Sequence, residues 1–90
     1  MQKNFRSLER LVRGFSNHRR IEIMLLLKAT PELSVHEIAE ELRINFKTAS
    51  EHIRRLAIAG LVLKRNEGTT VRHALTKRAE NVLKFLRILE

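Results

Sequence analysis

The sequence has no cysteine, aspartate, tryptophan or tyrosine, and its 90 residues include only one proline and three glycines. Without cysteine there can be no disulfide, no thiolate metal ligand and no nucleophilic thiol, which is typical of a reducing compartment. Glutamate is the only carboxylate side chain left for acid–base catalysis, and the tyrosine and tryptophan rings that stack single-stranded bases are missing. These absences argue against an enzyme and against an RNA-binding sheet.

Long hydrophobic runs are also missing. The longest uninterrupted apolar run covers residues 23–27, far short of the roughly 20 residues that span a bilayer. The N-terminal segment carries a charge every few residues and has no apolar signal region. We therefore expect a cytoplasmic protein with no membrane partner. Because the chain is near the small end of what folds alone, we expect residues 1–90 to form one domain that gains stability by dimerisation.

Positive charge is concentrated in one part of the chain. Residues 43–78 contain nine lysines and arginines and two glutamates, a net charge of +7 out of +8 for the whole sequence. The preceding residues 32–42 contain four glutamates and no basic residue. Such segregation predicts a polyanion as the partner of the basic region.

Hydrophobic periodicity and capping signals predict a mainly α fold with a small β-hairpin. The expected helices lie near 3–13, 17–29, 34–42, 46–59 and 77–89, and the expected strands near 61–65 and 70–75. The second helix is apolar nearly all round, so we expect other elements to surround it. Ser34 and Glu37 match a capping box, while Asn45 and Thr76 can cap the helices that follow them.

Glycines mark the two remaining turns of this pattern. Gly60 suits the left-handed position that ends the fourth helix, with Leu61 folding back on Leu56. Gly68 suits the left-handed position of a four-residue hairpin loop over 66–69. Two short helices around a tight turn, followed by a hairpin, form the pattern of a winged helix-turn-helix.

The helix over 46–59 carries the candidate binding surface. Its apolar positions Phe46, Ala49, Ile53 and Leu56 are expected to face the core, so the basic positions project outward at roughly 100° per residue. Residues near the start of such a helix read bases in the major groove, and later basic residues bind phosphate. The candidate DNA-binding residues on this helix and on the hairpin, or wing, are Asn45, Lys47, Thr48, Ser50, Glu51, Arg54, Arg55, Lys64, Arg65, Asn66, Thr69 and Arg72.

Glu51 and the basic residues outside the proposed binding surface have simpler interpretations than contact with DNA. A run of charges is usually a solvated face, which we accept for Lys77 and Arg78. A carboxylate that faces phosphates weakens DNA binding unless it accepts a hydrogen bond from a cytosine amine or forms an ion pair with a nearby basic residue. Arg54 and Arg55 lie three and four residues after Glu51, so pairing and base reading both stay open.

The first and last helices have more apolar surface than one small core would bury. Phe5, Leu8, Val12 and Phe15 recur at helical spacing, and the apolar residues of the last helix cover more than half of its circumference. This surplus predicts a partner helix. The candidate dimer-interface residues are Phe5, Leu8, Val12, Phe85, Leu86, Ile88 and Leu89.

The four histidines, at positions 18, 36, 52 and 73, do not form a metal-binding pattern. None makes the close helical pair or mixed cluster that metal sites favour. We expect His52 to be a packed residue bonded to backbone and His73 to face the core side of the hairpin. No serine has a base and an acid arranged around it, and no glycine-rich phosphate loop is present. We therefore expect no catalysis, no metal and no cofactor.

Four stretches in this order resemble the ArsR family of winged-helix repressors, over about residues 15–89. The stretches cover residues 20–24, 34–42, 48–56 and 59–62. The resemblance implies a homodimer built from the first and last helices that binds a pseudo-palindromic operator as a prokaryotic transcriptional regulator. It favours repression, although the sequence itself leaves repression and activation open.

Three departures limit what the resemblance transfers. No cysteine lies within 34–39 and no histidine in the last helix, which excludes metal sensing by the family's known sites. Arg43 stands where the family commonly has glycine, and a left-handed arginine costs on the order of 1 kcal/mol, which leaves room for a turn of another shape. Glu51 occupies a position that is often polar or basic, so no operator sequence is transferred.

Two other classes of function stay open from sequence alone. In one, the apolar last helix and the basic face dock an acidic partner protein. In the other, the chain coats DNA without sequence preference. A small-molecule effector is possible, but no residue pattern identifies one.

Overall fold

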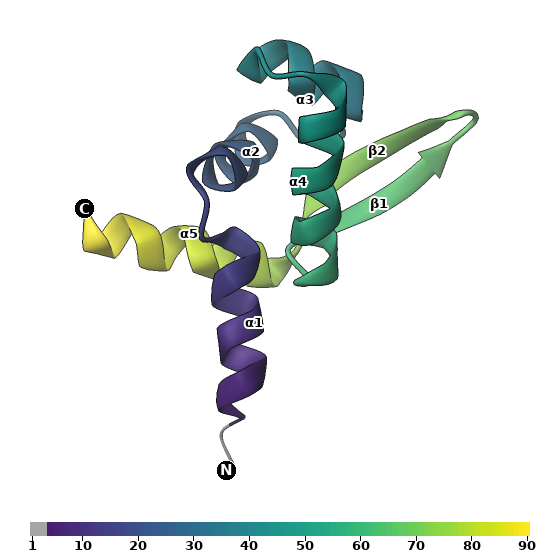
Figure 1. The fold of residues 1–90 in the computed structure, drawn as a ribbon. Coiled ribbons are helices and arrows are strands. Elements are labelled where there is room, and N and C mark those ends of the chain that lie inside the picture. The colour runs from purple at the N-terminus through teal and green to yellow at the C-terminus, as the bar shows by residue number, and fades with distance from the viewer. Residues whose placement is uncertain (1–3) are drawn as a thin grey trace.

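The computed structural model describes residues 4–90, which form five helices and one antiparallel hairpin, as the sequence predicts (Figure 1). The elements are α1 (Phe5–Phe15), α2 (His18–Ala29), α3 (Val35–Leu42), α4 (Phe46–Ile58), β1 (Val62–Glu67), β2 (Thr70–Leu75) and α5 (Lys77–Leu89). No helix in this part of the chain is long and apolar enough to cross a membrane.

Several predicted boundaries differ from the observed ones by one or two residues. The predicted start of the first helix at residue 3 lies outside the described residues; α1 begins at Phe5, where the Asn4 side chain accepts from the Ser7 amide at 3.0 Å. The same helix ends at residue 15 rather than 13. Helices α2 and α3 begin one residue later than predicted because Asn17 and Ser34 are their N-caps.

The wing is longer than predicted and its turn is tighter. Strand β1 runs from Val62 to Glu67, and Glu67 pairs with Thr70, so the loop contains only Gly68 and Thr69. Gly68 has φ = 61°, as predicted for the left-handed position. A two-residue turn of this kind matches the strand twist, which lets pairing continue through residues that the sequence placed in the loop.

The core forms where α2 meets α3, α4, α5 and β2 (Figure 1). Ile23, Met24 and Leu27 of α2 are fully buried there, together with Ile38 and Ile53. The expectation that α2 is surrounded on all sides is wrong at one position, because Leu25 is 53% exposed. One side of α2 is therefore open beside α5.

The turn between α3 and α4 keeps the left-handed shape despite its arginine. The capping box at the start of α3 is present, with Ser34 and Glu37 bonding each other's amides. At the other end Arg43 has φ = 55° and ψ = 45°. Its amide donates to Glu40 and the Ile44 amide donates to Ala39, at 3.2 and 3.1 Å. The alternative of a differently shaped turn is wrong, because these two bonds offset the cost of the strained residue.

The residues predicted to begin and end helix α4 lie at its two ends. Asn45 accepts from the Thr48 amide at 2.7 Å. At the other end Gly60 has φ = 76°, and the Leu61 amide donates to the Leu56 carbonyl at 2.9 Å. The helix ends at Ile58 rather than 59, since residue 59 is its C-cap.

Phe46 is not part of the core, contrary to the prediction. It is the first residue of α4 and is 48% exposed. Its ring lies against the ring of His36 on α3, with the centroids 4.6 Å apart. The helical periodicity placed Phe46 on the buried face, but the first turn of α4 extends beyond the layer that the core fills.

The base of the wing is fixed by His73, which is buried as predicted. The His73 ring nitrogen Nδ1 lies 2.8 Å from the Leu33 carbonyl, and its backbone bonds both Glu32 and Leu33. The segment before α3 thereby adds a short third edge to the hairpin. Burial lowers the pKa of His73 below its usual range.

Candidate nucleic-acid interface

The outer face of α4 exposes the side chains that the sequence predicted. Ala49, Ile53 and Leu56 are buried against the core, which holds the helix at a fixed rotation. The exposed candidates on this helix are Lys47, Thr48, Glu51, Arg54 and Arg55, and Ser50 is half-buried. Asn45 is exposed too, but its side-chain oxygen is used as the N-cap.

Glu51 pairs with both neighbouring arginines. Its carboxylate accepts from Arg54 at 3.0 and 3.1 Å and lies 3.2 Å from Nε of Arg55. The hydrogen bond from Arg54 is the main reason that the pKa of Glu51 falls below its usual range. Of the two open interpretations of Glu51, pairing is the one that the structure contains. Within residues 4–90, Lys47 makes no ion pair.

The arginines of the wing are paired with an acidic segment that the sequence analysis treated as separate. Arg65 donates to Glu32 at 2.8 Å and to Glu67 at 3.2 Å. Arg72 donates to the Glu37 carboxylate at 3.1 Å. The carboxylate of Glu32 raises the pKa of Arg65. The acidic segment before and within α3 therefore neutralises the base of the wing instead of lying apart from it.

The wing candidates do not share one face of the hairpin. Cross-strand partners in an antiparallel pair lie on the same face, and successive residues alternate. Arg65 is opposite Arg72, so these two form one face. Lys64 is opposite His73, and Asn66 follows on that second face. Thr69 is exposed at the tip.

Arg20, which no sequence pattern marked as a site residue, links α1, α2 and α4. Its guanidinium lies 3.5 Å from Nδ1 of His52 and donates to the Arg13 carbonyl at 3.2 Å, while its buried Nε has no partner among the described residues. The expected backbone partner of His52 is therefore replaced by a side chain, since the backbone of α4 is already bonded within the helix. Burial, followed by the charge of Arg20, lowers the pKa of His52. The one sequence signal at Arg20 is that it begins residues 20–24, the first of the stretches that resemble the ArsR family.

A second apolar surface lies on α1 and α5. The predicted interface residues exposed there are Phe5, Leu8, Val12, Phe85, Ile88 and Leu89. Leu86 differs from them, because it is half-buried and packs against the core. In Figure 1, α1 and α5 extend away from the end of the molecule where α3, the start of α4 and the wing tip lie.

Within residues 4–90, no three histidine, aspartate or glutamate side chains cluster closely enough to hold an ion.

The chain is similar to several known bacterial regulators. Residues 17–64 match the family described as bacterial regulatory protein, arsR family. The transcriptional activator HlyU of Vibrio cholerae is 34% identical over 76 residues, which are 84% of this chain and 69% of HlyU. The HlyU structure has a TM-score of 0.82 at 31% identity and covers 99% of this chain and 97% of its own.

A structure from Mycobacterium bovis is similar over the same length. It is the homodimeric winged helix-turn-helix DNA-binding domain of a possible ArsR-family transcriptional regulator, with a TM-score of 0.85 and 26% identity. The match covers 99% of this chain and 87% of that one. The family match spans more than half of the chain, and the fold and a relative at this identity agree with it, so the chain belongs to the bacterial ArsR family of winged helix-turn-helix regulatory proteins.

Proposed function

We propose that the chain acts in the cytoplasm as a homodimer that binds double-stranded DNA at an inverted-repeat operator and regulates transcription. One observation supports the proposal above the others: the start of α4 carries a rigidly held outer face where Thr48 and Ser50 lie beside Lys47, which makes no ion pair within residues 4–90. The major groove admits a helix, and side chains at its N-terminal end read base edges. In this proposal Lys47 approaches guanine acceptors.

In this proposal the other basic residues fix the register of the protein on the duplex and its affinity. Arg54 and Arg55 follow Lys47 along the same helix face, where guanidinium groups meet phosphate. The exposed tip of the wing, with Asn66 and Thr69, reaches an adjacent phosphate or minor groove. Contacts to phosphate fix the register of the protein on the duplex without reading its sequence.

The dimer is proposed on the exposed apolar residues of α1 and α5. Phe5 and Ile88 are 74% and 79% exposed, which is costly for side chains of this size in a monomer. The related domain from Mycobacterium bovis is a homodimer. A two-fold axis between the two α4 helices, the recognition helices in this proposal, puts the half-sites about one helical turn apart, on the order of 10 base pairs.

We propose repression as the regulatory effect, because a dimer that occupies a duplex excludes other proteins without any further contact. The relative from Vibrio cholerae is named an activator. A reporter gene placed downstream of the selected operator distinguishes repression from activation. Its expression should rise when the regulator gene is deleted, and a fall would identify an activator.

Selection from a random duplex library at near-physiological salt tests the proposal, because salt suppresses non-specific binding. We expect an inverted repeat to be enriched. Lys47→Ala should relax one position in each half-site and weaken operator binding by about 5- to 150-fold for each half-site, because a homodimer loses the contact twice. Lys77→Ala, which removes the same charge at the start of α5, is the matched control and should keep the preference.

Three outcomes would contradict the proposal in different ways. No enrichment with retained affinity would identify a protein that coats DNA. No affinity at all would favour the docking of an acidic partner protein instead. An enriched site that Lys47→Ala leaves unchanged would remove Lys47 from the base-reading residues.

A further inference from the structure

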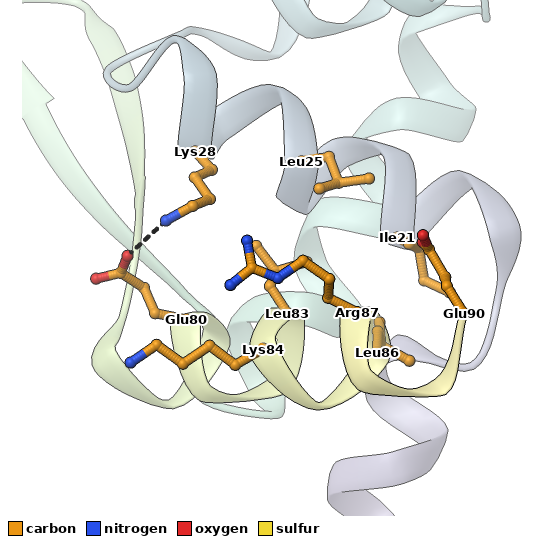
Figure 2. Close-up of a pocket in the computed structure, with 9 residues that line it drawn as sticks. All are labelled: Ile21, Leu25, Lys28, Glu80, Leu83, Lys84, Leu86, Arg87 and Glu90. Carbon is orange, nitrogen blue, oxygen red and sulfur yellow. Dashed lines mark hydrogen bonds and ion pairs between the residues drawn. The ribbon is translucent and has the colours of Figure 1, made fainter.

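A groove of about 190 Å³ lies between α2 and α5, apart from the recognition helix and the wing (Figure 2). Its floor is apolar and consists of Ile21 and Leu25 from α2 with Leu83 and Leu86 from α5. Leu25 is 53% exposed, although it belongs to the helix that forms most of the core. The groove is smaller than the sites that hold drug-sized ligands, so it suits a small molecule.

Charged side chains surround this floor. Lys28 donates to Glu80 at 3.1 Å and closes one end of the groove with a neutral pair. Lys84 and Arg87 also line the groove and make no ion pair within residues 4–90. Figure 2 shows the Arg87 guanidinium over the space between the two helices. The side-chain carboxylate of Glu90 lies at the other end, beside Ile21, so the basic side chains around the groove exceed the acidic ones by one.

The groove lies on a different side of α5 from the exposed apolar residues. Arg87 follows Phe85 by two positions, which is about 200° around a helix. A partner that covers Phe85 and its neighbour Ile88 therefore leaves the Arg87 side of α5 accessible. A second copy of the chain that packs on Phe85 and Ile88 would therefore lie on the opposite side of α5 from Arg87.

We propose that the α2–α5 groove binds a small organic anion with an apolar body, of the class of medium-chain carboxylates. The apolar part lies on Leu25 and Leu83, where it removes exposed hydrocarbon from water. The carboxylate lies against Arg87, whose planar guanidinium can donate two parallel hydrogen bonds, with Lys84 adding a second positive charge. This site extends beyond the proposed DNA binding, and its test does not involve DNA.

Sodium octanoate, used below its micellar concentration, is the probe for this site, and 1-octanol is its neutral analogue. Each is titrated into the whole chain with labelled leucine and isoleucine methyl groups. We expect octanoate to shift the methyl signals of Ile21, Leu25 and Leu83 at saturation, while those of Ile38 in the core of α3 stay unchanged. Octanol should bind at least about tenfold more weakly, because it lacks the charged hydrogen bonds.

Two sets of variants separate the charge from the apolar floor. Lys84→Gln combined with Arg87→Gln should weaken octanoate binding at least about tenfold and leave octanol binding unchanged. Leu25→Glu places a carboxylate in the groove and should abolish octanoate binding. Leu63→Glu is its matched control, because Leu63 is 62% exposed on the wing, and it should bind as the unchanged chain does. Core methyl signals in each variant report whether it is folded.

Other outcomes would overturn the proposal. Equal binding of octanoate and octanol would show a groove without anion recognition. Shifts confined to Leu11 and Val12, in the hollow between α1 and α5, would place the ligand elsewhere. If Leu25→Glu changes the oligomeric state, the occupant is a second copy of the chain. Absence of any shift at saturating octanoate would show that the groove binds no such ligand.

Discussion

Gly14 lies where α1 meets α4, and we predict that Gly14→Ala destabilises the protein although alanine is the better helix former. A Cβ atom at Gly14 would lie 2.3 Å from the Cβ of Ala59. Carbon atoms pack at about 3.5–4.0 Å, so the two helices must separate by roughly 1.2 Å to accept the added methyl group. The helix that would move is the one that carries Phe5 and Val12 of the proposed dimer surface.

Two opposing effects set the magnitude of the change. Overpacking of this kind costs about 1–3 kcal/mol. Alanine in place of glycine within a helix recovers about 1 kcal/mol. The net loss in the free energy of unfolding is therefore about 0–2 kcal/mol, and the single variant alone does not prove the clash.

A second substitution isolates the contact. Ala59→Gly removes the Cβ that clashes, and the nearest remaining atoms, the Ala59 Cα and the Arg55 carbonyl oxygen, lie at ordinary distances of 3.8 and 3.9 Å. In that background Gly14→Ala should become stabilising by about 1 kcal/mol, the helix propensity alone. The coupling between the two sites is then about 1–3 kcal/mol, equal to the relieved clash.

Urea unfolding of all four proteins, followed by far-ultraviolet circular dichroism, measures this cycle. All four must be compared at one protein concentration, since association adds to apparent stability. A coupling below about 0.5 kcal/mol would mean that the two substitutions act independently. That result would refute the close packing of α1 on α4.

Three further predictions concern charge, pH and assembly. Glu51→Gln should raise DNA affinity about two- to fivefold at low salt, because it releases the guanidinium groups of Arg54 and Arg55. Glu9→Gln breaks a similar ion pair on α1 and should leave the affinity unchanged, and fluorescence anisotropy with a labelled duplex compares the two variants. In the folded chain the pKa values of His73 and His52 are lowered from an ordinary value of about 6.5, so the unfolded chain binds more protons near this pH. The free energy of unfolding should therefore fall as the pH drops below about 6.5, and unfolding midpoints that stay constant there would contradict this. Ile88→Glu should yield monomers in analytical ultracentrifugation, and a persistent dimer would move the interface away from α5.

The elements of the fold could be predicted because their signals are local. A capping box lies within four residues, and a glycine at a left-handed position marks a turn wherever it occurs. Arg43 shows the limit of this reasoning, since arginine alone disfavours a left-handed turn. The backbone hydrogen bonds from the Arg43 and Ile44 amides to the end of α3 nevertheless hold that shape and offset a cost of about 1 kcal/mol.

The candidate site was predictable only in part, because its electrostatics depend on contacts between distant segments. The exposed face of α4 follows from helical periodicity, and so does the nearness of Glu51 to Arg54. No periodicity places Glu32 beside Arg65, which is 33 residues further along the chain. The groove between α2 and α5 could not be predicted for the same reason, because its two walls lie far apart in the sequence.

The net charge of +8 overstates how strongly the proposed interface attracts random DNA. Arg54 and Arg55 already hold Glu51, and Arg65 already holds Glu32. Under the proposed function a phosphate takes the place of a carboxylate, so each contact exchanges one anion for another and gains less than an unpaired guanidinium would gain. Operator and random duplex lose this phosphate energy equally, but only the operator keeps its base contacts. Binding at physiological salt should therefore depend on sequence more than the basic composition alone implies.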